Sequence, residues 1–144
     1  MSKKIIIGFI AVFLISCSGQ KGPSKDDVVL LMNEYFEKVK QNDFSLVETY
    51  YSEAFYENTN KEKWEELYNK VHSILGELIS VELESWSMRS VLATSGSGKY
   101  FIFVYKNKYE NGDAIETINI FIPKNENVIK INGHNYNSEA FIGL

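Results

Sequence analysis

The sequence contains a single cysteine, Cys17, and only two histidines, His72 and His134. One cysteine excludes any disulfide within the chain. Zinc sites need several converging His, Cys or carboxylate ligands, so this composition argues against one. The sequence also lacks a Gly-x-Ser-x-Gly nucleophile elbow and an Asp-rich calcium loop of the EF-hand type. We therefore expect no cofactor and no resident metal.

The chain also lacks an excess of positive charge. Its formal net charge is -4, whereas a protein that grips a phosphate backbone needs clustered Lys and Arg. A nucleic-acid partner is therefore not expected. The stretch Gly96-Ser97-Gly98-Lys99 has the composition of a phosphate-binding loop, but such loops open a helix, and here a strand is predicted to follow. A hairpin turn is the better interpretation.

No apolar run is long enough to span a membrane. Ile5 to Ile15 is apolar apart from Gly8, and a helix of that length covers only about 16 Å. A bilayer core requires about 20 residues. Because Lys3 and Lys4 precede the run, the segment is typical of the basic and apolar regions of a signal peptide.

The run ends in Leu14-Ile15-Ser16-Cys17, which resembles the lipobox of bacterial lipoproteins. The resemblance implies that residues 1–16 are a lipoprotein signal peptide, that cleavage falls between Ser16 and Cys17, and that Cys17 is acylated. The expected location is the cell envelope, on a lipid membrane held through Cys17. If the host has two membranes, Ser18 favours the outer one. The alternative is an ordinary secretory signal peptide that happens to contain a cysteine.

Residues 17–23 are predicted to be a flexible tether after the lipidated Cys17, because Gly, Ser and Pro dominate them. One domain follows, over residues 24–144. Ser24 and Asp27 predict a capping box, and apolar residues then recur every three or four positions in a helix to near Asn42. A shorter helix is predicted from Phe44 to Tyr51.

Thr59 and Glu62 predict a second capping box, which opens a third helix that Gly76 ends. After Gly76 the apolar period changes from that of a helix to the alternation of a strand. Apolar residues then move to the other parity at Trp86, which predicts a β-bulge near Ser85.

Three further strands are predicted. Lys99 to Tyr109 is rich in aromatic and β-branched residues, and Asn111-Gly112 is typical of a type I′ hairpin turn. Ala114 to Ile122 then pairs back, and a last strand begins at Val128 and runs on to Tyr136. Helices followed by a four-stranded antiparallel sheet predict an α+β fold, with N-terminal helices packed on a curved sheet.

This pattern resembles nuclear-transport-factor-2-like and cystatin-like domains, and within them a secreted family, domain of unknown function 4019. One departure is Ile129, where relatives commonly carry Trp. The resemblance implies the fold and leaves the function open. The matching features are Trp64, Leu75-Gly76, Arg89, the strand at 100–105, Glu116-Thr117-Ile118 and the ending at 129–136.

Four residues are candidates for a pocket between the helices and the sheet: Tyr105, Glu116, His134 and Tyr136. Aromatic side chains make up 14% of the chain and suit a concave site for a small apolar ligand. We expect a non-catalytic module that binds such a ligand or assembles with an envelope protein. The alternative is an enzyme of the same fold that performs acid–base chemistry on a small apolar molecule.

Overall fold

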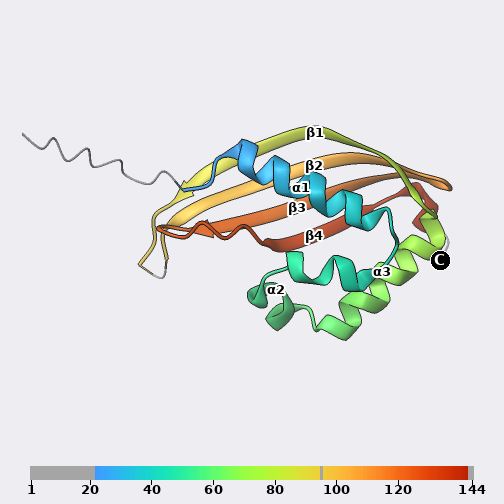
Figure 1. Cartoon of the computed structure of the whole chain (residues 1–144), viewed down its shortest axis with the longest axis horizontal. Helices are drawn as coiled ribbons and strands as arrows, with labels where there is room; N and C mark the ends of the chain where they lie inside the picture. Colours follow the sequence, from blue (N-terminus) through green and yellow to red (C-terminus); the bar gives the residue numbers. More distant parts are fainter. Residues whose placement is uncertain (1–21, 95, 143–144) are drawn as a thin grey trace, which may run out of the picture.

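The computed structural model describes residues 22–94 and 96–142. The predicted signal peptide at 1–16, including Ser16, lies outside the described residues, as does Cys17. Helices precede a curved four-stranded antiparallel sheet whose strands follow one another in chain order (Figure 1). The predicted α+β class is confirmed. Within the described part of the chain, the helices are too short or too polar to cross a membrane.

Helix α1 (Lys25–Val39) begins with the predicted capping box. The Ser24 backbone N–H donates to the Asp27 carboxylate at 2.7 Å, and the Asp27 N–H donates to Ser24 Oγ at 3.3 Å. The helix ends before Asn42, whose φ of 50° is left-handed and does not continue a helix. Its apolar stripe is buried against the sheet: Val28, Met32, Tyr35, Phe36 and Val39.

The single helix predicted from Phe44 to Tyr51 is wrong. Two 3₁₀ turns take its place, η1 (Phe44–Leu46) and η2 (Glu48–Tyr50). The Asp43 carboxylate accepts the Ser45 N–H at 2.9 Å and so caps η1, which favours the tighter turn at this point. A short helix that the sequence did not predict, α2 (Glu53–Asn58), follows.

Helix α3 (Lys61–Leu75) is capped by Asn60, whose Oδ1 accepts the Lys63 N–H at 3.2 Å. The predicted cap, Thr59, instead ends α2. Gly76 ends α3 as predicted, with a φ of 77° that residues with a Cβ rarely adopt.

The sheet consists of β1 (Leu78–Val91), β2 (Gly98–Tyr109), β3 (Gly112–Pro123) and β4 (Ile131–Asn137). The predicted bulge is confirmed, because the register of β1 on β2 shifts between Leu83 and Ser85. This shift keeps Leu83 and Trp86 on the same face of β1 although their parities differ. On β2 and β3, buried side chains alternate with less buried ones, so one face of the sheet carries the core.

The turn between β2 and β3 differs from the predicted type I′ turn. Tyr109 pairs with Gly112, so Glu110 and Asn111 form the loop, and neither has the positive φ that this turn requires. Asn111 instead bonds to the end of α3: its backbone N–H donates to the Leu75 carbonyl at 2.9 Å. The last strand also begins at Ile131 rather than at Val128, which is exposed.

The two edges of the sheet are unlike each other. Beside β4, the Ser52 N–H donates to the Ile131 carbonyl at 2.9 Å, and Tyr51 forms a parallel bridge to the same residue. The segment before α2 therefore covers the start of that edge. The outer edge of β1 pairs with no segment among residues 22–94 and 96–142.

Candidate functional site

All four predicted site residues lie on the helix-covered face of the sheet. Glu116 is on β3, and both His134 and Tyr136 are on β4. Glu116 pairs in register with Tyr136 on one side and with Tyr105 of β2 on the other. The Tyr136 ring stacks on the His134 imidazole, with centroids 4.3 Å apart and an interplanar angle of 28°.

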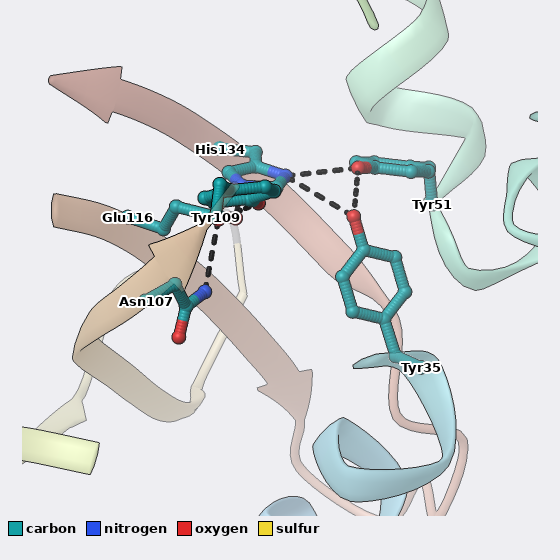
Figure 2. A network of polar contacts seen from close by, with 6 residues as sticks. All are labelled: Tyr35, Tyr51, Asn107, Tyr109, Glu116 and His134. Carbon is teal, nitrogen blue, oxygen red and sulfur yellow. Dashed lines mark hydrogen bonds and ion pairs between the residues drawn. The ribbon is translucent and has the colours of Figure 1, made fainter. Parts of the chain in front are cut away.

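Glu116 is the centre of a buried network of hydrogen bonds (Figure 2). Its Oε1 accepts hydrogen bonds from Asn107 Nδ2 at 2.9 Å and from the Tyr109 hydroxyl. Its Oε2 lies 2.9 Å from His134 Nε2. A buried carboxylate needs such partners, because losing water without replacing its hydrogen bonds is costly.

His134 carries the network from the sheet to the helices. Its Nδ1 lies 2.9 Å from the Tyr51 hydroxyl, which is itself 2.8 Å from the Tyr35 hydroxyl (Figure 2). With Nε2 donating to Glu116, a neutral ring accepts from Tyr51 at Nδ1, and a protonated ring donates to it. Both ring nitrogens therefore have a partner within the protein, and the side chain of His134 is fully buried.

The network favours an ionised carboxylate and neutral phenols. Burial acts to raise the pKa of Glu116, but the hydrogen bond and charge of His134, with the bonds from Tyr109 and Asn107, hold that pKa below its usual value. Burial raises the pKa of Tyr51 well above 10, and that of Tyr35 likewise. The phenols therefore keep their protons at neutral pH and act as hydrogen-bond partners.

Tyr105 does not join this network. Its ring packs on Phe36 with centroids 4.8 Å apart, and its buried hydroxyl has no partner among the described residues. The Tyr136 hydroxyl is likewise buried and unpartnered within the described part of the chain. The structure thus brings Glu116, His134 and Tyr136 together and leaves Tyr105 in the aromatic core.

Four residues of the network were not predicted as site residues: Asn107, Tyr109, Tyr35 and Tyr51. Asn107 and Tyr109 share the inward parity of Tyr105 on β2, so the alternation of that strand was a signal that they face the core. The part of Tyr35 and Tyr51 could not be predicted, because nothing local in the sequence shows that their hydroxyls meet each other and His134.

A pocket of about 280 Å³ lies between α3, β4 and the C-terminal turn η3 (Glu139–Phe141). We call it the α3–β4 pocket. The pocket reaches His134 and Tyr136. The Trp64 ring stacks on the Tyr136 ring, with centroids 6.2 Å apart. A wider depression of about 680 Å³ lies over the β2–β3 hairpin and does not include these residues. The α3–β4 pocket is lined by Trp64, Leu67, Lys70, Val71, Ile74, His134, Asn135, Tyr136 and Phe141.

The second histidine, His72, lies on α3 and is buried. Its ring lies against Tyr68, with centroids 4.2 Å apart, and burial lowers its pKa to about 4. Across residues 22–94 and 96–142, no three His, Cys, Asp or Glu side chains converge in a way that would hold a metal ion. Because its pKa is this low, His72 packs in the core as a neutral ring at neutral pH.

The fold and the network define a small α+β domain with a buried Glu–His pair beside an apolar pocket. The chain belongs to the family described as protein of unknown function (DUF4019), which matches residues 32–133. The match covers α1 from Met32 and continues to the start of β4. Neither a curated protein nor a solved structure matches the chain.

Proposed function

We propose that the protein is a membrane-anchored lipoprotein of the cell envelope whose domain binds a small apolar ligand without chemistry. The observation that carries the binding role is the α3–β4 pocket, whose lining is mainly apolar and aromatic. At about 280 Å³ it suits a ligand at the small end of the usual range.

Exposed apolar side chains support this role. Leu67 lies on α3 with 45% of its surface exposed, and it faces the pocket together with Ile74 and Phe141. An apolar ligand seated there would remove these side chains from water, which stabilises the complex in proportion to the area buried. Lys70 is the one cationic side chain of the lining, so it would orient an acidic group on the ligand.

The contacts of His134 argue for binding rather than catalysis. A general base needs a free nitrogen within hydrogen-bond reach of the substrate, and both nitrogens of His134 bond to Glu116 and Tyr51. The alternative, an acid–base enzyme, requires the ring to leave Tyr51 and turn Nδ1 toward the pocket. Its support is the Glu116–His134 pair, in which a carboxylate orients an imidazole.

Membrane attachment rests on the sequence resemblance at Cys17. Each buried CH₂ of an acyl chain contributes about 0.8 kcal/mol, so the two or three chains of a bacterial lipoprotein would hold the domain stably at a membrane. Residues 17–23 would then separate the domain from the lipid surface. An envelope protein that docks over the pocket is the second kind of partner this location would provide.

The pocket is tested with an apolar fluorescent probe, 8-anilinonaphthalene-1-sulfonate. We expect the folded protein to bind the probe and Leu67→Asp to bind it at least about tenfold more weakly, because a negative charge would enter the apolar wall and repel the sulfonate of the probe. Leu30→Asp is the matched control, since Leu30 is exposed on α1 and lies outside the pocket. Equal binding by both variants, or no binding by the wild type, would remove the pocket as a ligand site.

Access to His134 separates binding from catalysis. In the binding proposal, folded protein treated with diethyl pyrocarbonate is modified at His134 only slowly, because the ring is buried and both nitrogens are bonded. Mass spectrometry locates the modification. Rapid modification of His134 in the folded state would favour the enzyme alternative. For the anchor, Cys17→Ser should abolish labelling by radioactive palmitate, and retained label would exclude acylation at Cys17.

A further inference from the structure

The long edge strand β1 is the most exposed element of the sheet. Its seven residues 84–90 are exposed in succession, on both faces of the strand. Every second residue of an edge strand directs its backbone N–H and C=O away from the neighbouring strand, toward any chain that can pair with it. Among the described residues nothing pairs with this edge, whereas the start of the β4 edge is covered by Tyr51 and Ser52.

Apolar side chains accompany the exposed edge. Trp86 and Met88 pair in register with the buried residues Phe103 and Phe101 of β2, so they lie on the helix-covered face. They remain 47% and 46% exposed, and the Lys25 ammonium of α1 lies 5.6 Å from the Trp86 ring centroid. The edge therefore combines free backbone groups with an unburied apolar stripe.

The sequence of β1 is complementary to itself when two copies run antiparallel. Glu84 is the extra residue of the bulge, because the register passes from Leu83 to Ser85. With Glu84 left out, a pairing centred on Trp86 places Glu82 opposite Arg89 of the second copy. The same pairing places Leu83 opposite Met88, and every pair joins side chains on the same face.

Other registers lose this complementarity. A shift by one position brings the apolar face of one copy opposite the polar face of the other. A shift by two positions in either direction places Arg89 opposite Ser80 or Ser85, which separates both charge pairs. Arg89 is held on the outer face, where its guanidinium lies 4.8 Å from the Tyr100 ring centroid. Glu82 shares this outer face, because it is one residue before the inward-facing Leu83.

We propose that β1 is a dimerisation edge that pairs antiparallel with β1 of a second copy of this chain, around a twofold axis at Trp86. The two four-stranded sheets then join into one sheet of eight strands. A twofold pairing repeats every contact, so two Glu82–Arg89 pairs and two Leu83–Met88 pairs form in each dimer. The proposal does not depend on ligand binding, because the α3–β4 pocket contains no residue of β1.

Charge reversal tests the pairing in the full-length chain, solubilised in detergent and analysed by native mass spectrometry. We expect the wild type to be dimeric, and both Glu82→Arg and Arg89→Glu to weaken the dimer about tenfold or more, because each places like charges opposite one another. The double variant Glu82→Arg with Arg89→Glu should restore the dimer. A monomeric wild type, or a dimer equally stable in both single variants, would overturn the proposal.

Cysteine cross-linking provides a second readout that depends on register alone. In a Cys17→Ser chain, Trp86→Cys places two thiols across the twofold axis, where facing Cα atoms lie about 4.5–5.5 Å apart, within disulfide range. Ser90→Cys is the control, because its two copies would be about 26 Å apart. A disulfide dimer of Trp86→Cys alone supports the register. Cross-linking at both positions or at neither overturns it, and an adduct with a different protein in cells assigns the edge to an extended segment of that protein.

Discussion

Replacing Glu116 by glutamine should destabilise the domain by about 2 kcal/mol at pH 7, because the buried carboxylate is the acceptor at which the polar network converges. The carboxylate accepts hydrogen bonds from Asn107, Tyr109 and His134. Hydrogen bonds to a charged group contribute about 1.5–3 kcal/mol each, and neutral ones about 0.5–1.5 kcal/mol. In Glu116→Gln the amide oxygen still accepts two of the three, but more weakly.

The third bond has to reverse its direction. The glutamine amide is a donor where the carboxylate was an acceptor, so His134 must accept at Nε2 and donate from Nδ1 to Tyr51. That tautomer remains bonded, which is why we expect a smaller cost than the 3–5 kcal/mol typical of breaking a buried charge pair outright. Against a total stability of about 5–15 kcal/mol, the loss is readily measured.

Urea unfolding followed by circular dichroism provides the assay, with Glu66→Gln on α3 as the exposed control that should change stability by less than about 0.5 kcal/mol. Because the folded-state pKa of Glu116 lies below its usual value, its ionised form stabilises the fold above about pH 4.5. This contribution is lost as pH falls through the lower folded pKa, so the variant and the wild type should converge under acid conditions. A difference below about 0.5 kcal/mol at pH 7, or one that persists unchanged in acid, would refute the reasoning.

Three further variants test other parts of the fold by the same unfolding assay. Burial lowers the pKa of His72 in the folded state from its usual 6.5 to about 4, so the unfolded chain binds its proton first as pH falls. The free energy of unfolding of the wild type should therefore fall by about 3 kcal/mol between pH 6.5 and 4, and His72→Phe should make it depend less on pH. The same pH dependence in both proteins would contradict a buried neutral ring. Gly76→Ala should lower the free energy of unfolding by about 2 kcal/mol or more, because a residue with a Cβ is strained at φ 77° and this Cβ would also meet the Glu110 side chain. A loss near zero would show that the turn relaxes. Ser24→Ala should cost about 1 kcal/mol through loss of the α1 cap, and an unchanged midpoint would exclude that contribution.

Local patterns predicted the sheet well because they depend on short-range geometry. The change of parity between Leu83 and Trp86 located the bulge, since the side chains of a strand alternate strictly between its two faces. The type I′ turn failed for a long-range reason: Asn111 bonds to the end of α3, 36 residues earlier in the chain. Contacts of this kind leave no periodic trace in a sequence.

The candidate site shows the same division. A carboxylate at Glu116, in phase with the buried residues Ile118 and Ile120, is a local signal of a polar group in the core. That His134 would meet it follows from β3–β4 pairing, which the predicted strand order allowed. The contact of His134 with the hydroxyls of Tyr35 and Tyr51 depends on how the helices pack on the sheet. The packing of the whole core determines that arrangement.

The wide sequence separation within the network determines when it is able to form during biosynthesis. The Tyr35–His134 and Tyr51–His134 contacts join residues 99 and 83 positions apart, and β4 is the last strand of the domain. A chain that emerges from a ribosome or a translocation pore from its N-terminus therefore exposes Glu116 before its histidine partner arrives. Non-local contacts of this kind form late and slow folding. The network can thus form only when almost the whole domain is free, and until then the Glu116 carboxylate lacks the imidazole that it bonds to in the folded state.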